Sequence, residues 1–203
     1  MVGAAIKDGY IKSLDDKVTQ YIPEMKGSAY DDVTIAQLLT MTSGIKWNED
    51  YEDPKSDVAR FNEHKAEPGI DVTVSYMRKL PREAPAGTKW VYKTGETNLI
   101  GVLVSKATGK KLSDYLSEKV WAPFGMEQDA SWLLGSSGHE ISGCCIQAST
   151  RDYARFGMFI HFGLYSVHAR GANEQSNARM SKSAYRIYFD EFNPKRYDPH
   201  AWA

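Results

Sequence analysis

Helix signals separated by long polar connections constrain this fold more than any other feature of the sequence. The segment Thr34–Gln37 predicts a capping box, because the threonine hydroxyl can accept a hydrogen bond from the first turn while the glutamine reaches back. Residues Leu38–Met41 supply an apolar stripe, and Gly44 suits a left-handed cap at the carboxyl end of the helix. Few segments alternate as strands do, so the first 150 residues are predicted to be rich in helix with irregular loops.

Three further helices follow from local signals. One covers Asn98–Ala107 and ends at Gly109, and a second covers Leu112–Val120 before a turn that contains proline and glycine. A third starts at Ser149 or at the threonine after it. The apolar run at residues 157–163 fits either a helix or a buried strand, because so short a run has no decisive period.

Charge and hydropathy exclude two classes of partner. The 203 residues contain 25 Lys plus Arg and 26 Asp plus Glu, a net charge of −1. A surface for nucleic acid or for an anionic membrane would favour a basic excess, so neither partner is expected. No apolar run approaches the roughly 20 residues that cross a bilayer. The first residues lack a basic segment followed by a hydrophobic stretch, so no signal peptide is expected.

The only two cysteines, Cys144 and Cys145, are adjacent. Neighbouring cysteines rarely pair with each other, because the disulfide strains the intervening peptide. They are not spaced as a zinc site, and the chain has no Cys-x-x-Cys. We therefore expect buried structural thiols, with reactive thiols as the alternative, and we expect no metal site and no cofactor.

The strongest functional signal comes from three stretches, Ile35–Ile45, Pro85–Gly101 and Gly143–Gly157, with Ala122–Met126 between the last two. Together they resemble the β-lactamase and penicillin-binding-protein superfamily, including its esterase and 6-aminohexanoate-oligomer hydrolase members. The resemblance covers about residues 1–160. It implies an α+β fold of the β-lactamase/transpeptidase type, present here as a mostly helical fragment.

The resemblance also implies a mechanism. In that superfamily a serine attacks a carbonyl carbon, a lysine one helical turn later takes the serine proton, and a tyrosine relays it to the leaving group. Tyr92 falls on the tyrosine of the family motif, and Thr94 falls on the polar residue that can donate a hydrogen bond to the substrate. A tyrosine with an ordinary pKa of ~10 acts as a base only beside a cation. The alternative is that Tyr92 is simply a half-buried aromatic residue beside Trp90.

Two other family elements are expected to be missing from this chain. The Ser-x-x-Lys of the family lies shortly before the segment that matches Val2–Gly9, where this chain begins. The Lys-Thr-Gly-type strand that shapes the oxyanion side is not found. The one Ser-x-x-Lys present runs from Ser43 to Lys46, and its serine is the alternative nucleophile. We expect it to be structural, because Gly44 is predicted to end a helix and the two side chains would then diverge.

The last part of the chain resembles a different family. Phe156–Val167 is similar to the first barrel strand and loop of α-L-fucosidases, and Phe189–Trp202 is similar to the following helix and turn. This resemblance implies a short barrel-like tail and places His161 on a histidine that binds the sugar. The alternative is that His161 is a partly exposed histidine, because a closed barrel needs roughly 250 residues.

These observations predict two domains, a serine-hydrolase fragment at residues 1–160 and an α-L-fucosidase-like fragment at residues 161–203. The predicted function is hydrolysis of a small-molecule ester, amide or β-lactam through an acyl-enzyme, with the chain inactive alone because its nucleophile is absent. A non-catalytic chimeric or truncated fragment and a remnant of an α-L-fucosidase are the alternatives. A fragment would expose apolar surface through which copies could self-associate.

Overall fold

The structure is a computed structural model that describes residues 1–156. Its helices are mostly short, and one antiparallel pair of strands joins Ser131 to Gln147 and Trp132 to Ile146. In chain order the elements are α1 (Val2–Lys7), α2 (Val18–Tyr21), the 3₁₀ turn η1 (Pro23–Met25), α3 (Ile35–Leu39), α4 (Asp57–Glu63), α5 (Val72–Met77), α6 (Thr94–Thr108), α7 (Leu112–Leu116), the π-helical turn η2 (Ser117–Trp121), β1 (Ser131–Trp132), β2 (Ile146–Gln147) and α8 (Thr150–Phe156).

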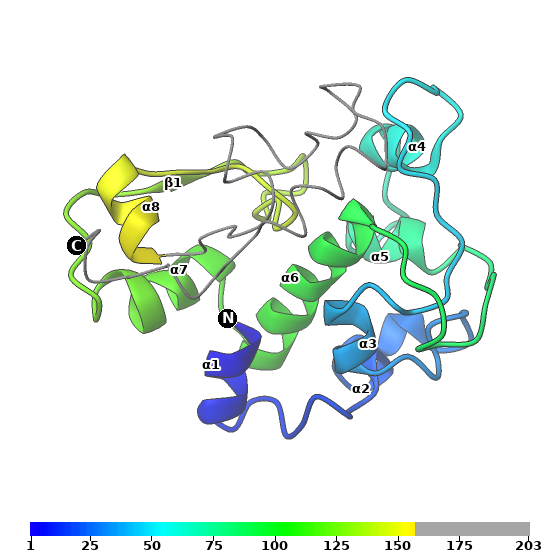
Figure 1. The fold of residues 1–203 in the computed structure, drawn as a ribbon, viewed down its shortest axis with the longest axis horizontal. Coiled ribbons are helices and arrows are strands. Elements are labelled where there is room, and N and C mark those ends of the chain that lie inside the picture. Colours follow the sequence, from blue (N-terminus) through cyan, green and yellow to red (C-terminus); the bar gives the residue numbers. More distant parts are fainter. Residues whose placement is uncertain (157–203) are drawn as a thin grey trace, which may run out of the picture. The chain divides into compact units, whose positions relative to one another are not determined.

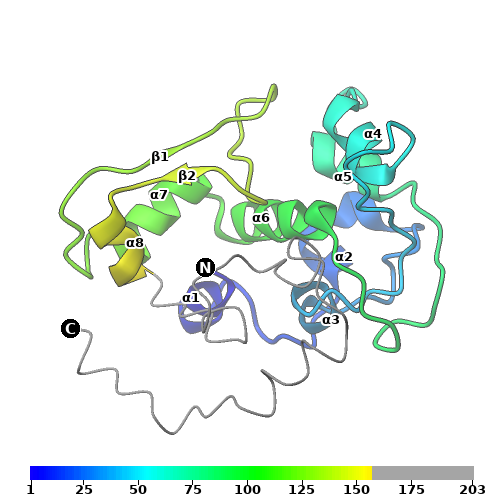
Figure 2. The same ribbon diagram turned by 45° about the horizontal axis from the view of Figure 1, so that its top comes forward.

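Helix α6 is the centre of the described residues. It contacts α1, α2, α3, α4, α5 and α7, and Figures 1 and 2 show these elements arranged around it. The helix buries Leu99, Leu103 and Val104 within a core shared with the short helices. Other fully buried members of this core include Ile11, Val18, Ile22, Met25, Val33, Ile35, Leu38 and Met77. Because helices this short are marginal alone, packing against α6 supplies most of their stability.

Helix α6 is longer than predicted. Its carboxyl end is confirmed, since Gly109 adopts the left-handed cap with φ 67°. Its start was placed at Asn98, whereas the helix begins at Thr94. The Thr94 N–H donates to the Glu49 carboxylate over 3.0 Å, a cap from 45 residues away that local signals cannot show.

The capping box of α3 is confirmed, but the predicted cap at Gly44 is wrong. Thr34 Oγ1 accepts from the Gln37 N–H at 3.2 Å, and Gln37 Oε1 accepts from the Thr34 N–H at 3.0 Å. The helix ends at Leu39, and Met41 takes the left-handed conformation with φ 55°. Gly44, with φ 74°, instead marks a close approach of the chain: its carbonyl accepts from two N–H groups of the 83–84 segment.

The other two helix predictions are confirmed in place. The helix that starts at Leu112 passes into the π-helical turn and ends at Trp121. In α8, Ser149 Oγ accepts from the Asp152 N–H at 3.1 Å and so caps the helix. The buried Asp152 carboxylate accepts the N–H groups of Glu127 and Gln128, at 2.7 and 3.0 Å, and ties α8 to the segment after η2.

The prediction of buried thiols at the adjacent cysteines is wrong. Cys144 is exposed, Cys145 is half-buried, and their sulfurs are joined in a disulfide. Cys145 has φ 78°, a left-handed conformation that turns the chain sharply between the two residues. The turn is fixed by β1, because the Cys145 carbonyl accepts from the Leu133 N–H at 3.1 Å and the Cys144 carbonyl accepts from Trp132 Nε1 at 3.0 Å.

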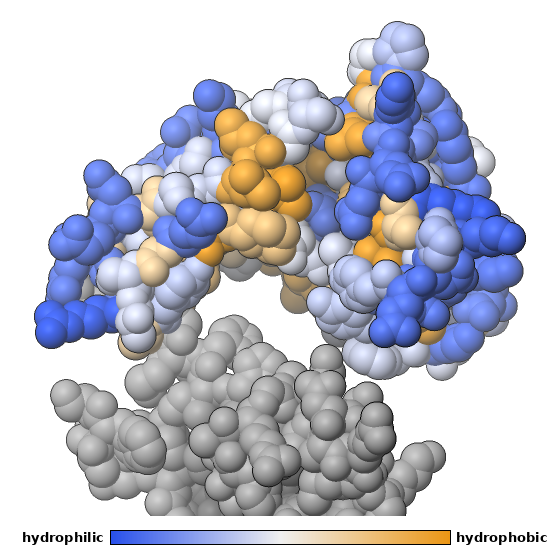
Figure 3. Space-filling model, turned by 90° about the horizontal axis from the view of Figure 1, so that it is seen from above, coloured by the Kyte–Doolittle hydropathy of each residue, from blue (hydrophilic) through white to orange (hydrophobic). Residues whose placement is uncertain are grey.

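The surface of the described residues is mixed in character. Figure 3 shows hydrophobic residues gathered in patches between strongly hydrophilic ones, and the exposed large hydrophobic residues include Leu133 and Leu134. Among the described helices, none is long and apolar enough to cross a bilayer.

The predicted barrel-like tail and the apolar run at residues 157–163 lie outside the described residues.

The close approach of the backbone at Gly44 can be tested against Gly27, which has nearly the same φ angle. A Cβ on Gly44 would collide with the Ala84 carbonyl, whereas a Cβ on Gly27, with φ 76°, meets nothing within 4 Å. We expect Gly27→Ala to cost only the left-handed strain of about 1–2 kcal/mol. Gly44→Ala should lower the free energy of unfolding by a further ~2 kcal/mol or more in urea titrations. Equal losses for the two variants would show that the loop yields without cost.

Candidate functional site

Tyr92 lies on the extended segment that leads into α6. Its side chain is 50% exposed, and the neighbouring Trp90 is 65% exposed, so both aromatic residues face solvent. The segment is fixed behind them by the Val91 N–H, which donates to the Met41 carbonyl at 3.1 Å. The placement leaves Tyr92 accessible to a small molecule from solvent.

Thr94, the first residue of α6, is bound to two residues that sequence analysis missed. Its hydroxyl donates to Glu49 Oε1, and it lies 3.2 Å from the Tyr51 hydroxyl. Tyr51 in turn donates to Glu49 Oε1 at 2.6 Å, and this hydrogen bond raises the Tyr51 pKa. Trp47 Nε1 also donates to the Glu49 carboxylate. Glu49, Tyr51 and Thr94 together form what we call the acceptor cluster.

The only sequence signal for the acceptor cluster was weak. Glu49 and Tyr51 belong to a long polar connection rich in acidic residues, which reads as a solvated loop. What fixes Glu49 is the start of α6, where unpaired N–H groups and the helix dipole favour a carboxylate. The Thr94 hydroxyl was expected to donate a hydrogen bond to the substrate, but in the structure it donates to Glu49 and leaves its oxygen as an acceptor.

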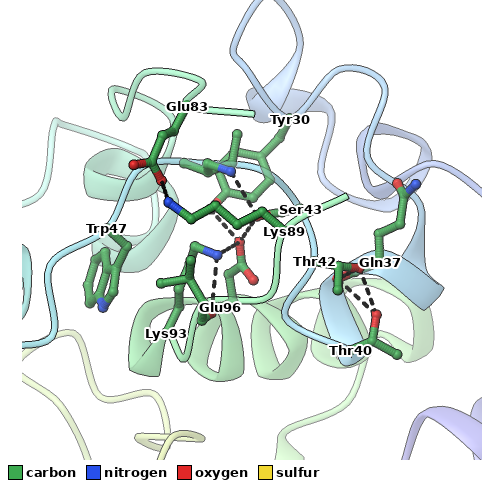
Figure 4. A network of polar contacts seen from close by, with 12 residues as sticks. Tyr30, Gln37, Thr40, Thr42, Ser43, Trp47, Glu83, Lys89, Lys93 and Glu96 are labelled. Atoms are coloured by element: carbon green, nitrogen blue, oxygen red, sulfur yellow. Dashed lines mark hydrogen bonds and ion pairs between the residues drawn. The ribbon is translucent and has the colours of Figure 1, made fainter. Parts of the chain in front are cut away.

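A second polar group, the buried cluster, consists of Tyr30, Ser43, Lys93 and Glu96. Figure 4 shows the other three converging on Glu96. Glu96 Oε1 accepts from the Tyr30 hydroxyl at 3.2 Å and from the Ser43 hydroxyl, and lies 3.8 Å from Lys93 Nζ. The side chains of Lys93 and Glu96 are both 0% exposed. Among the described residues, Glu96 Oε2 has no hydrogen-bond partner.

Burial dominates the electrostatics of this cluster. Desolvation raises the pKa of Glu96, opposed by the Ser43 hydroxyl, the Lys93 ammonium and the Tyr30 hydroxyl. Desolvation lowers the pKa of Lys93, opposed mainly by Glu96. Burial and the Glu96 charge raise the pKa of Tyr30 well above its ordinary value. The Glu96 charge is therefore favoured by Lys93 and the two hydroxyls, and the Lys93 charge is favoured by Glu96 and the Val91 carbonyl.

The Ser-x-x-Lys of this chain does not form a nucleophile–base pair in the structure. Ser43 is completely buried; its hydroxyl donates to Glu96 and accepts from the Ile45 N–H at 3.2 Å. Lys46 is exposed. The two side chains diverge as expected, although the reason is a loop conformation rather than a helix end at Gly44.

A cavity of about 590 Å³ runs along α6 from Asn98. Its walls include α6 residues Val102 and Ser105, the start of α5 and residues 135–142. Asn98 ties these parts together, since its Nδ2 donates to the Thr94 carbonyl at 3.1 Å and its Oδ1 accepts from the Gly143 N–H at 3.2 Å. The cavity therefore starts one helical turn from the acceptor cluster.

The remaining candidate residue, His161, lies outside the described residues. Within residues 1–156, no group of three His, Cys, Asp or Glu side chains is placed to hold a metal ion. The structure thus brings Tyr92 and Thr94 to one end of α6 and adds Glu49 and Tyr51 beside them.

A model of the beta-lactamase family matches residues 2–203. The chain belongs to that family. It is 30% identical to 6-aminohexanoate-dimer hydrolase of Paenarthrobacter ureafaciens over 163 residues, which cover 77% of this chain and 41% of that protein.

Solved structures show the same fold. A Bacillus anthracis protein described as a 6-aminohexanoate-dimer hydrolase matches with a TM-score of 0.64 at 22% identity, covering 93% of this chain and 48% of its own. A class C beta-lactamase solved with cefoxitin matches with a TM-score of 0.54 at 20% identity, covering 75% of this chain and 44% of its own. The chain spans less than half the length of each of these proteins.

The comparisons confirm the predicted family and the β-lactamase/transpeptidase-like fold. The described part is largely helical, as expected. The family match also runs through residues 157–203, where the sequence resembles α-L-fucosidases. That second resemblance and the two-domain division stay predictions.

The raised pKa of Glu96 gives a pH-dependent prediction. A carboxyl group whose pKa is raised on folding stabilises the protein below its ordinary pKa, here 4.5, and this contribution is lost as pH rises through the folded value. The free energy of unfolding of the wild type minus that of Glu96→Gln should therefore fall as pH rises from 4. The fall is about 1.4 kcal/mol for each unit by which the pKa is raised.

Urea titrations of both proteins between pH 4 and 8 measure this difference. Glu52→Gln, which removes an exposed carboxylate, is the matched control for the loss of one acid. A difference that rises with pH would contradict the assignment of burial as the dominant cause.

Proposed function

We propose that this chain carries the tyrosine side of a serine-hydrolase site, with Tyr92 transferring a proton during acyl transfer from a small-molecule ester, amide or β-lactam. The observation that carries the proposal is the half-exposed Tyr92 immediately before α6, next to Thr94. Membership of the beta-lactamase family supports it. Thr94 is proposed to contact the substrate, and the cavity that starts at Asn98 offers room for part of it.

The acceptor cluster favours amides within this substrate class. The oxygens of the Thr94 and Tyr51 hydroxyls, whose protons go to Glu49, can accept from a substrate that presents N–H donors. An ester presents no such donor at its reacting group. The similarity to a 6-aminohexanoate-dimer hydrolase agrees with an amide substrate.

We also propose that the chain forms no acyl-enzyme alone. Ser43 belongs to the one Ser-x-x-Lys in the sequence, and its hydroxyl is buried against Glu96. A tyrosine base also needs a neighbouring cation, and the adjacent Lys93 is turned inward to Glu96. The non-catalytic alternative shares this outcome but assigns Tyr92 no role, and the fucosidase alternative rests on residues outside the described part.

Intact mass after incubation with a fluorophosphonate and, separately, with a penicillin tests the absence of a nucleophile. We expect no stoichiometric adduct on folded wild type and the same spectrum for Ser43→Ala. An adduct present on wild type and absent from Ser43→Ala would identify Ser43 as a live nucleophile. An adduct on both proteins would place the nucleophile on another serine, and either adduct would contradict the proposal of inactivity.

Tyr92→Phe tests the role of the tyrosine. In a mixture where a second polypeptide supplies the missing serine and lysine and turnover is measurable, the variant should lower kcat by about 10²–10⁴-fold, the usual contribution of general acid–base catalysis. Tyr10→Phe, at another exposed tyrosine, is the control. Unchanged turnover in Tyr92→Phe would remove the case for the family mechanism and favour the non-catalytic alternative.

A further inference from the structure

One member of the buried cluster, Lys93, directly follows Tyr92 in the chain. Lys93 has an extended backbone, with φ −142° and ψ 103°, before it opens α6. Consecutive side chains of an extended chain point to opposite sides. Lys93 is completely buried while Tyr92 is half-exposed, so the inward lysine is what turns the tyrosine outward.

Lys93 also closes a clamp around Tyr92. Its Nζ donates to the Val91 carbonyl at 3.2 Å, so the side chain of one neighbour holds the backbone of the other. The Val91 N–H is held in turn by the Met41 carbonyl at 3.1 Å. At the other end, the Lys93 carbonyl accepts from the Glu96 N–H at 3.1 Å and starts the helix. The peptide group before Tyr92 is therefore held through the Val91 carbonyl, and the residues on both sides of the tyrosine are anchored by backbone hydrogen bonds.

An apolar side chain of similar size could occupy the space of Lys93, but it could not hold the Val91 carbonyl by a hydrogen bond. Burying an ammonium group costs several kcal/mol unless a partner compensates it, and packed hydrophobic residues are often at least as stable as a buried ion pair. The ammonium provides a hydrogen bond to the Val91 carbonyl that a hydrophobic residue cannot. Glu96 keeps the ammonium inward and is itself held by the hydroxyls of Tyr30 and Ser43.

We propose that Lys93 and Glu96 form a positioning pair for Tyr92. Glu96 draws the Lys93 ammonium inward, the ammonium clamps the Val91 carbonyl, and the clamped segment projects the Tyr92 side chain beside the start of α6. Both members are positioning residues that act through Tyr92 and touch no substrate. The inference rests on the proposed function of Tyr92, but the placement of the tyrosine can be measured without turnover.

The test uses the full chain with ¹³C-labelled tyrosine rings, and Tyr92→Phe assigns the Tyr92 signal. Lys93→Met leaves Glu96 buried without its cation and risks unfolding. The double variant Lys93→Met/Glu96→Gln removes both charges, while the glutamine can still accept from Tyr30 and Ser43. The matched control is Lys106→Met, at a lysine farther along α6 that forms an ion pair with Glu24 of η1.

In the double variant we expect the Tyr92 ring signal to shift toward that of free tyrosine and the Val91 amide to exchange at least tenfold faster. The ring signal of the buried Tyr115, whose hydroxyl donates to Asp8 and not to the cluster, should stay as in the wild type, as should the circular dichroism. Lys106→Met should leave Tyr92 and Val91 unchanged. A folded double variant with unchanged Tyr92 signal and Val91 exchange would overturn the proposal and leave the pair a purely structural role.

Failure of the proposed function would look different. A wild-type Tyr92 that is ordered and that loosens in the double variant supports the positioning pair whatever the labelling and turnover experiments show. A Tyr92→Phe variant with unchanged turnover would instead remove the role of the tyrosine while leaving the measured placement intact.

Discussion

The buried carboxylate of Glu96 is the interaction on which the rest of the described structure depends. Tyr30 follows η1, Ser43 follows α3, and Lys93 precedes α6, and all three side chains meet at this one group. A polar group taken out of water is costly when it loses its partners, so removing any one of these side chains from Glu96 while it stays buried would be unfavourable. The carboxylate thereby couples the short N-terminal helices to the one long helix.

Two acidic residues contact the start of α6 and play different structural roles. Glu96 is in the first turn and points into the core, whereas Glu49 reaches the same turn from the 47–53 loop and accepts the Thr94 N–H. Negative charge near a helix amino terminus is favoured by the unpaired N–H groups and the helix dipole. Tyr92 and Thr94 lie where these two acids hold the first turn of α6.

Local rules predicted those parts of the fold that depend on neighbours in sequence. The capping box at Thr34, the left-handed cap at Gly109 and the serine cap of α8 are each decided within a few residues. The start of α6 and the true role of Gly44 were missed, because each depends on a segment about 40 residues away in the chain.

The candidate site, like the fold, could be predicted from the sequence only in part. Tyr92 and Thr94 were found through the family resemblance, and the structure brings both to the start of α6. Glu49 and Tyr51 were overlooked because an acidic loop usually is solvated. Lys93 and Glu96 were overlooked because charged residues are seldom fully buried, and no sequence pattern marks the few that are.

Native-state hydrogen exchange tests the central role of Glu96 most directly. The account predicts that the amides of Ile45, Val91 and the Leu99–Leu103 turn of α6 exchange with one common opening free energy, since the buried cluster joins their segments. The contradicting result is a much lower opening free energy for Ile45 and Val91 than for α6. The segments would then open independently, and the carboxylate would not hold them together.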